Sequence, residues 1–344
     1  MSTAYQFYIS TLLVYLGVDV MACWAFNLQI GVTGIINFAF VVFQAAGAYT
    51  AAVLTLGPSA ALGGFQQYIG GGSLPFPLPL LAAALGGALL SLLVGGIALR
   101  RLRSDYQALV MLVVSQIAVS VVHNEVGLFN GSAGLSLVPQ PLSSALNLSP
   151  IGYQWFYVGL TAVMVGIVYL VVHRVTASPL GRTLRAIRDN EQAAAACGKN
   201  VFALRMVAFA TGGAIAAVSG AVLVMFIGAW APGGWLYPET FVLLAAVVIG
   251  GSGNNAGVVV GALLVPVAFL EATRFLPAIP GHPGLIDALQ WVVTALLMLL
   301  FLWFRPQGIL PERRRHFLPL PGLRATSLPS GTARAGDAGE GPIA

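Results

Sequence analysis

The densest group of residues suited to ionic chemistry lies between Ser178 and Gly198. Its charged side chains are Arg182, Arg185, Arg188, Asp189 and Glu191. Ser178-Pro179 is typical of a helix start, and Gly198 is a natural stop. Leu180, Leu184 and Ile187 follow i, i+4, i+7 spacing and so share one helix face. We therefore expect one short amphipathic helix, with Arg182 and Arg185 pointing away from the apolar face and Arg188 at its edge.

Two interpretations of this helix stay open. It is either an interfacial helix whose arginines meet acidic lipid headgroups, or a docking element that a soluble protein partner grips. The acidic and amide residues at 189–192 favour the protein partner, because anionic lipid repels carboxylates.

A second group consists of neutral amides in apolar surroundings next to glycines. The amides are Asn27, Gln29, Asn37, Gln44, Asn254 and Asn255, and the glycines are Gly31, Gly34, Gly250, Gly251, Gly253 and Gly257. Glycine runs are poor helix interiors, so we expect broken helices at both places. Half-helix ends offer backbone donors and acceptors that suit a zwitterionic solute. The amides are thus candidates for lining a solute path, or they only satisfy the broken backbone.

Several chemistries are excluded by the residues present. The pattern G-x-x-x-x-G-K-S/T that holds nucleotide phosphates is missing, because Lys199 is the only lysine and lacks the upstream glycine and the following hydroxyl. His123, His173, His282 and His316 show no spacing suited to a metal or a catalytic pair. We expect no cofactor and no enzyme activity in this chain.

Composition places these groups in a membrane. The chain has 344 residues, of which 58% are hydrophobic and 8% charged, whereas soluble domains carry about 25% charged residues. Apolar segments fall near 8–28, 33–56, 77–99, 105–124, 153–173, 203–229, 239–271 and 286–304. The sequence predicts an all-α polytopic bundle with about eight apolar segments, and the net charge of +5 does not indicate nucleic acid binding.

Charge in the loops predicts the topology. Basic residues cluster after the third segment, around 174–205, and after the last segment, so these regions are expected to be cytoplasmic. The stretches 57–76, 125–152 and 230–238 contain no Lys or Arg and are expected on the other side. Segment 239–271 must then either cross twice or dip into the membrane and return, as two half-helices joined by a Gly-Asn turn. Residues 1–315 form the expected transmembrane domain, and 316–344 a disordered cytoplasmic tail.

Four blocks of sequence resemble a known family, the permease subunits of bacterial branched-chain amino-acid ABC importers, and among them the second, M-type subunit. The blocks are Asn27 to Ala52, Arg103 to Leu109 with Asn130 to Leu135, Gly181 to Glu191, and Gly250 to Gly261 with Phe304-Arg305-Pro306-Gln307-Gly308-Ile309-Leu310. Asp19 and Asn254-Asn255 depart from the family pattern, which leaves the solute open more than the fold.

The resemblance implies partners and a location. Such a permease pairs with a homologous permease subunit, two ABC ATPase subunits bind beneath the pair, and a periplasmic solute-binding protein delivers the solute. The 180–198 loop would then be the helix that couples ATP hydrolysis to the bundle, which lies in the bacterial inner membrane with its C-terminus in the cytoplasm. We expect import of branched-chain or other neutral amino acids by alternating access.

Two alternatives remain from the residues alone. One is an ABC permease for urea or short-chain amides. The other is a proton-coupled secondary transporter that uses Asp19, the only clear carboxylate in the early apolar segments. For Asp19 itself, a hydrogen bond to a neighbouring helix or to the turn at Asn27 and Gln29 is favoured over a role in transport.

Overall fold

The computed structural model describes residues 3–59, 64–101, 104–274 and 285–312, all within the unit Met1–Glu312. Within these residues the regular structure is helical, and extended segments pair only at two isolated bridges, Tyr68 with Phe129 and Leu135 with Trp230. The expected tail at 316–344 lies outside the described residues.

Seven helical segments of the described chain are long and apolar enough to cross a membrane. They are Thr3–Val32, Leu78–Arg100, Tyr106–Asn124, Pro150–Ala177, Val201–Ile227, Pro232–Gly250 and Asn255–Thr273. Two shorter apolar helices, Phe40–Leu56 and Ala288–Phe304, complete the set. The predicted polytopic helical bundle is confirmed, and segment 239–271 corresponds to two helices.

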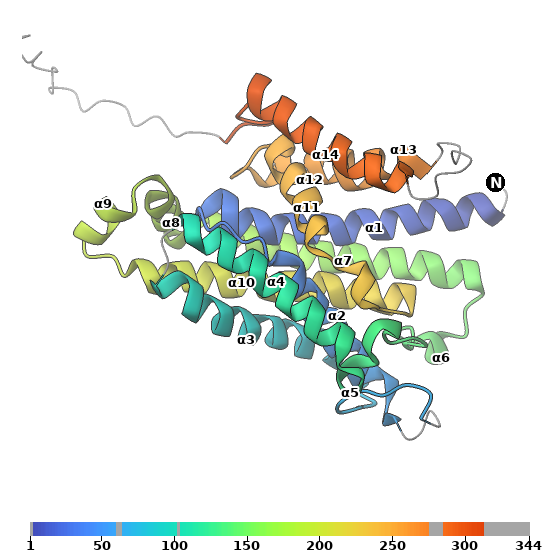
Figure 1. Cartoon of the computed structure of the whole chain (residues 1–344). Coiled ribbons are helices and arrows are strands. Elements are labelled where there is room, and N and C mark those ends of the chain that lie inside the picture. The colour runs from blue at the N-terminus through green and yellow to red at the C-terminus, as the bar shows by residue number, and fades with distance from the viewer. Residues whose placement is uncertain (1–2, 60–63, 102–103, 275–284, 313–344) are drawn as a thin grey trace, which may run out of the picture. The chain divides into compact units, whose positions relative to one another are not determined.

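The bundle has two distinct ends. Helices α8 (Pro179–Asp189) and α9 (Glu191–Ala196) lie at one end, and the short helices α5 (Val126–Phe129) and α6 (Ser143–Leu146) at the other (Figure 1). These are called the α8 end and the α5 end. Helix α7 (Pro150–Ala177) runs into α8, and α10 (Val201–Ile227) returns toward the α5 end. The arginine-rich loop and the loops free of Lys and Arg at 125–149 and 228–236 are thus separated, as the charge distribution predicts.

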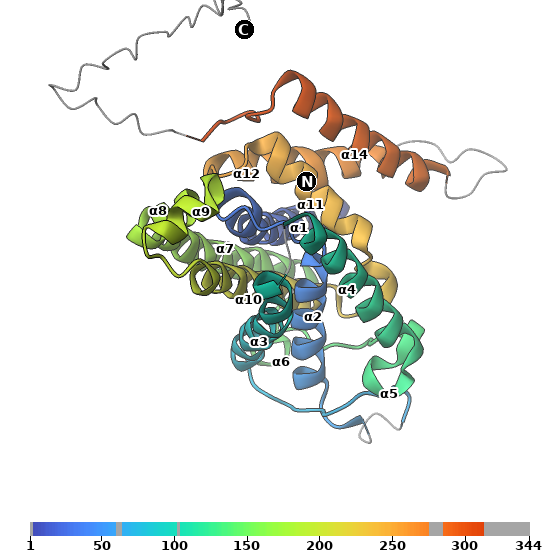
Figure 2. The same ribbon diagram turned by 60° about the vertical axis from the view of Figure 1, so that its left-hand side comes forward.

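Glycines allow the central helices to approach closely. Helix α10 packs along α2 (Phe40–Leu56) and α3 (Leu78–Arg101), with α4 (Ser104–Asn124) beside them (Figure 2). A Cβ atom on Gly47 would lie 2.0 Å from the carbonyl oxygen of Ala217, and one on Gly220 would lie 1.9 Å from that of Gln44. Without a hydrophobic force between helices in lipid, such small residues let backbones pack tightly.

Both predicted helix breaks are present. Helix α1 (Thr3–Asn27) widens into the π-helical segment η1 (Leu28–Val32), and the chain then runs irregularly until α2 begins at Phe40. The second break separates α11 (Tyr237–Gly250) from α12 (Asn255–Ala262), which continues through η5 (Leu263–Phe269) into α13 (Leu270–Arg274). Gly251 and Gly253 have φ of 118° and 84° in that turn, a conformation that favours glycine.

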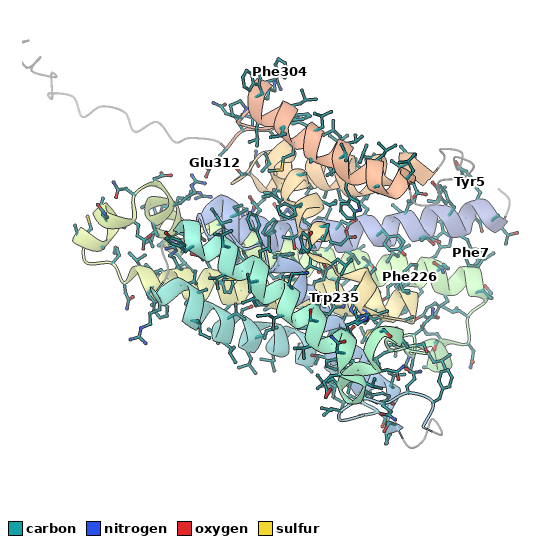
Figure 3. All side chains as sticks on the ribbon, in the orientation of Figure 1. Tyr5, Phe7, Phe226, Trp235, Phe304 and Glu312 are labelled. Carbon is teal, nitrogen blue, oxygen red and sulfur yellow. The ribbon has the colours of Figure 1, made fainter. Side chains whose placement is uncertain are left out.

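The α5 end is closed by loops that bond to one another. Gln66 Nε2 donates to the carbonyl of Ser136 at 3.0 Å, and Tyr68 Oη donates to the carbonyl of Gly57 at 2.8 Å. Burial raises the pKa of the Tyr68 hydroxyl above its ordinary value. Trp235, in the loop before α11, is buried in the interior of the bundle. Its side chain is 2% exposed and donates to the Tyr49 hydroxyl at 3.2 Å (Figure 3).

Candidate functional site

Helix α8 forms where the sequence predicts and is seated by its apolar face. The Ser178 hydroxyl accepts from the Gly181 N–H at 3.4 Å and caps the helix, and Pro179 is its first residue. Leu184 is fully buried in a small cluster with Leu28, Val32 and Ala208, which belong to the first break and to α10. The amphipathic helix is therefore confirmed, and its apolar face rests on the broken segment.

The predicted single helix over 178–198 is wrong at Asn190. This residue has an extended conformation, with φ −156° and ψ 102°, and its side chain accepts from the Ala193 N–H at 2.9 Å to cap α9. Asparagine competes in this way with the helical backbone, so it favours a cap over a helix interior. Helix α9 ends before Gly198, whose φ of 75° fits the predicted stop.

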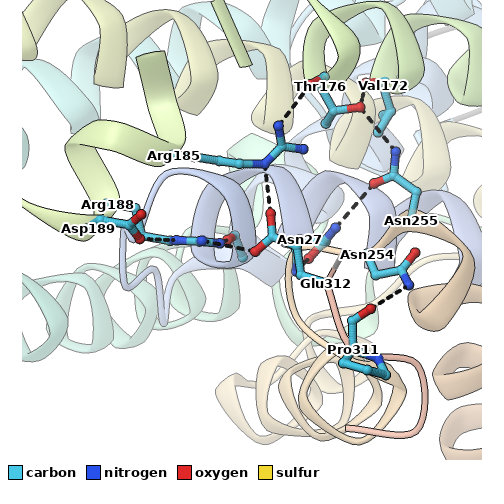
Figure 4. A network of polar contacts seen from close by, with 12 residues as sticks. Asn27, Val172, Thr176, Arg185, Arg188, Asp189, Asn254, Asn255, Pro311 and Glu312 are labelled. Atoms are coloured by element: carbon cyan, nitrogen blue, oxygen red, sulfur yellow. Dashed lines mark hydrogen bonds and ion pairs between the residues drawn. The ribbon is translucent and has the colours of Figure 1, made fainter. Parts of the chain in front are cut away.

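The arginines of α8 divide between surface and interior. Arg182 is exposed, whereas Arg185 and Arg188 turn back to the bundle and share the carboxylate of Glu312. Arg185 Nε lies 2.8 Å from Glu312 Oε1 without hydrogen-bond alignment, and Arg188 Nη2 donates to Glu312 Oε2 at 2.9 Å (Figure 4). Arg185, which was expected to point away from the apolar face of α8, is thus drawn toward the bundle by a carboxylate far along the chain.

Arg188 also reaches the first helix break. Its Nη1 donates to the carbonyl of Gly31 in η1, while its Nε donates to exposed Asp189 at 3.3 Å. A break releases backbone carbonyls that need a partner inside a membrane protein. Gly34, with φ 73°, lies so close that a Cβ atom there would be 3.0 Å from Arg188 Cγ. Arg188 therefore hydrogen-bonds directly to the backbone of the first helix break.

The two breaks meet through a buried asparagine. Asn27 Oδ1 accepts from the Gly253 N–H at 2.8 Å, and its Nδ2 donates to Asn255 Oδ1 at 3.3 Å. Asn255 Nδ2 in turn donates to Thr176 Oγ1 at 3.2 Å, at the end of α7. A Cβ atom on Gly31 would lie 2.6 Å from the nitrogen of Gly253, so the two glycines allow this contact. Part of the predicted coupling group, Arg185, Arg188 and Asp189, thus lies near three of the predicted solute-path amides, Asn27, Asn254 and Asn255, at the α8 end (Figure 4).

The other amides lie apart from this junction. Gln29 Nε2 donates to the carbonyl of Phe209 at 3.1 Å, and Asn37 Nδ2 donates to Gln29 Oε1 at 2.8 Å. Asn37 Oδ1 accepts from the Ala39 N–H at 3.0 Å and so supports the chain just before α2. Gln44 is 9% exposed and lies on α2 where that helix packs against Gly220.

Two further acidic residues have definite surroundings. Glu191 Oε2 accepts from Arg205 Nη1 at 3.0 Å, and the Arg205 side chain is only 9% exposed, so this pair fixes α9 to α10. Asp19 on α1 lies within the electrostatic reach of Glu239 on α11. Among the described residues neither Asn27 nor Gln29 bonds to Asp19, so the expected hydrogen bond to that turn is wrong.

The close fit of α11 against α12 depends on the remaining glycines of the second break. A Cβ atom on Gly250 would lie 2.2 Å from the carbonyl oxygen of Gly257, and one on Gly257 would lie 2.4 Å from that of Gly250. Across the described part of the chain, His, Cys, Asp and Glu form no group of three or more that could hold a metal ion.

Glu312 is the residue that sequence reasoning missed. It stands directly before a run of arginines, and the segment that contains it lacks helical periodicity. The sequence gives no signal that Glu312 pairs with Arg185 and Arg188, because this pairing depends on the path of the chain after α14 (Leu285–Phe304).

Comparisons with known proteins give one family. Residues 8–302 match the family described as "Branched-chain amino acid transport system / permease component". The chain is 27% identical over 248 residues to the probable branched-chain amino acid transport permease protein LivM of Methanocaldococcus jannaschii, which covers 68% of this chain and 69% of that protein. It is 28% identical over 309 residues to the high-affinity branched-chain amino acid transport system permease protein LivM of Escherichia coli, with 84% and 66% covered.

A shorter match is to the probable ABC transporter permease protein YphD of Escherichia coli, with 31% identity over 137 residues that cover 38% of this chain and 41% of that protein. The chain spans about two thirds of the length of the two LivM proteins. No solved structure matches it.

Proposed function

This chain belongs to the family of permease components of branched-chain amino acid transport systems, and from that premise we propose that it is the membrane-spanning subunit of an ATP-driven importer. It is a multi-pass membrane protein by its apolar helices. We place it in the bacterial cytoplasmic membrane, with the α8 end and the C-terminus in the cytoplasm. Residues 1–315 form the transmembrane domain in this proposal, and 316–344 the tail.

The observation that carries the proposal is the two-sided character of α8. Its inner side is buried on the first helix break and joined to the second, whereas Arg182, Ala186 and Asp189 on its outer side are exposed. A helix that only rested on lipid headgroups would need no such connection to the broken segments. This arrangement supports α8 and α9 as the place where an ATPase subunit docks and moves the bundle.

The proposed assembly is the one that the family resemblance implies. Two ABC ATPase subunits lie under a pair formed with a homologous permease, and ATP is hydrolysed on those subunits, because this sequence contains no phosphate-binding loop. The loops at the α5 end would receive a periplasmic solute-binding protein. Because Arg185 and Arg188 are engaged within the chain, the exposed Arg182 is the best candidate for direct contact with an ATPase. Asp189 and Glu191 are also exposed, but they are already paired with Arg188 and Arg205.

The proposed solute is a branched-chain or other neutral amino acid, moved by alternating access. Asn27, Asn254 and Asn255 have protein partners that hold the breaks together, which favours a structural role for these three. Gln29 and Asn37 likewise bond to protein groups, so Gln44 on α2 is the remaining candidate for the path in this proposal. Urea and short-chain amides remain alternatives to an amino acid.

A second candidate function rests on a separate observation. Asp19 and Glu239 are carboxyl groups within each other's electrostatic reach on apolar helices. Ionisable groups inside membrane segments commonly mark proton or ion pathways. This favours, as the second candidate, a secondary transporter coupled to protons.

Uptake of labelled leucine tests both candidates, with urea and a short amide measured in parallel. The chain is produced with its partner subunits, whose ATPases are either intact or disabled at their phosphate loops. We expect uptake of one solute class to disappear with the disabled ATPases. Uptake that survives, but is lost with a protonophore and with Asp19→Asn, would replace the proposal by the secondary transporter.

A further inference from the structure

The segment after α14 has no role in the proposed function so far. Residues 305–312, here called the strap, have the sequence Arg-Pro-Gln-Gly-Ile-Leu-Pro-Glu and run back along the turn between α11 and α12. The Ile309 N–H donates to the Ile249 carbonyl at 2.8 Å, and the Leu310 N–H donates to the Gly250 carbonyl at 3.1 Å. The strap is therefore bonded to the last residues of α11 through its backbone.

Glycines and one asparagine hold the strap against the turn. Gly308 has φ 74°, and a Cβ atom there would lie 2.4 Å from Gly251 Cα, so any side chain would push the two segments apart. Asn254 Nδ2 donates to the carbonyls of Leu310 and Pro311, both at 3.2 Å (Figure 4). Together with the two backbone bonds, these contacts make the strap and the turn one connected unit.

The strap ends at Glu312, which joins this unit to α8. Its carboxylate pairs with Arg185 at 2.8 Å and with Arg188 at 2.9 Å, and the three side chains are 23–31% exposed. A single exposed ion pair contributes little to stability. One carboxylate between two guanidinium groups, however, also offsets the repulsion between their two positive charges. Arg188 connects the same group to the carbonyl of Gly31 in the first break.

From these contacts we infer that the strap transmits movement of α8 to both helix breaks, with Glu312 as the positioning residue. The inference rests on the proposed function, because α8 must be moved by an ATPase for the connection to matter. Glu312 does not contact the ATPase or the solute in this scheme. It keeps Arg185 and Arg188 directed at the bundle, so that α8, η1 and the α11–α12 turn move together.

The test uses the full complex of both permeases, both ATPases and the binding protein in liposomes. Solute uptake and ATP hydrolysis are measured in the same preparation for the wild type and Glu312→Gln, which keeps the shape and removes the charge. We expect the ATPases to stay bound and hydrolyse ATP, while solute transported per ATP falls by about 3- to 30-fold, the range found when a coupling network is disturbed. Arg100→Gln, which removes the charge of an exposed arginine at the end of α3, is the control and should leave this ratio unchanged.

Each other outcome has a definite meaning. An unchanged ratio in Glu312→Gln overturns the inference, and so does loss of ATPase binding, because Glu312 would then serve docking alone. If Glu312→Gln reduces the yield of folded complex, Glu312→Asp is measured in its place. Aspartate retains the charge but has a shorter reach, so it should lower the ratio of solute to ATP less than Gln does. A wild-type ratio with Asp would also overturn the inference. A wild-type complex without ATP-dependent uptake would refute the proposed function itself, and that result is visible before any variant is made.

Discussion

Asn27 offers a sharp test of the junction between the two helix breaks. Its side chain is fully buried and has two partners, the Gly253 N–H at 2.8 Å and Asn255 Oδ1 at 3.3 Å. Leucine has the same branched shape with larger methyl groups, and it can neither accept nor donate a hydrogen bond. The substitution Asn27→Leu therefore removes both bonds and leaves the space filled.

The expected loss of folding free energy follows from the two polar groups that would lose their hydrogen-bond partner. The Gly253 N–H is buried, and a buried donor without a partner costs about 1–3 kcal/mol. The bond to Asn255 is longer and Asn255 is half-buried, so water replaces part of it and its loss costs about 0.5–1.5 kcal/mol. The sum is about 1.5–4.5 kcal/mol, which raises the ratio of unfolded to folded protein about 12- to 1,600-fold.

Reversible unfolding by sodium dodecyl sulfate in mixed micelles, followed by tryptophan fluorescence, measures this difference. Asn124→Leu is the matched control, because Asn124 is exposed and bonds only within its own helix, to the carbonyl of Ser120 at 2.8 Å. Its expected change is below about 0.5 kcal/mol. A result in which Asn27→Leu unfolds no more easily than Asn124→Leu would refute the reasoning that Asn27 joins the breaks.

Three further predictions concern other parts of the chain. Arg182→Glu reverses an exposed charge of α8 and should reduce co-purification of the ATPases by about tenfold, with unfolding of the permease alone unchanged. Gly47→Ala should destabilise the bundle by about 1–3 kcal/mol in the same detergent assay, because its Cβ atom would lie 2.0 Å from the Ala217 carbonyl oxygen; Gly96→Ala meets nothing within 4 Å and should be neutral. Tyr68 stabilises the fold while its hydroxyl stays protonated, and because its pKa is raised from 10.0, that contribution is complete below pH 10.0 and is lost as pH rises through the higher folded pKa. Thermal unfolding between about pH 8 and pH 11 should show this loss in the wild type and less of it in Tyr68→Phe.

The apolar segments and both helix breaks could be predicted because each depends on local sequence. About 20 consecutive apolar residues already form a membrane span, and the run Gly250-Gly251-Ser252-Gly253 excludes a continuous helix whatever surrounds it. The start of α8 is equally local, since Ser178 caps it and Pro179 fits only its first turn.

The direction in which a side chain points and the residue to which it bonds could not be predicted in the same way. The inward turn of Arg188 depends on Glu312, which lies 124 residues later in the sequence. The break at Asn190 is ambiguous in the sequence, because asparagine is tolerated in helices and preferred at their caps. The sequence gives no preference between solute contact and backbone support for Asn27, whereas its bond to the Gly253 N–H favours backbone support.

The hydrogen bonds at the two helix breaks affect how a movement of α8 reaches the rest of the bundle. Had the carbonyl of Gly31 bonded within its own segment, α8 would be joined to η1 only through apolar packing around Leu184. Because Arg188 of α8 satisfies that carbonyl instead, a shift of α8 alone would strand a polar group in the interior at a cost of about 1–3 kcal/mol. Asn27 extends the same argument to the second break, since its bond to the Gly253 N–H would be lost if η1 moved alone. Movement of α8 together with both breaks avoids these losses, so the hydrogen bonds that repair the broken helices also couple them.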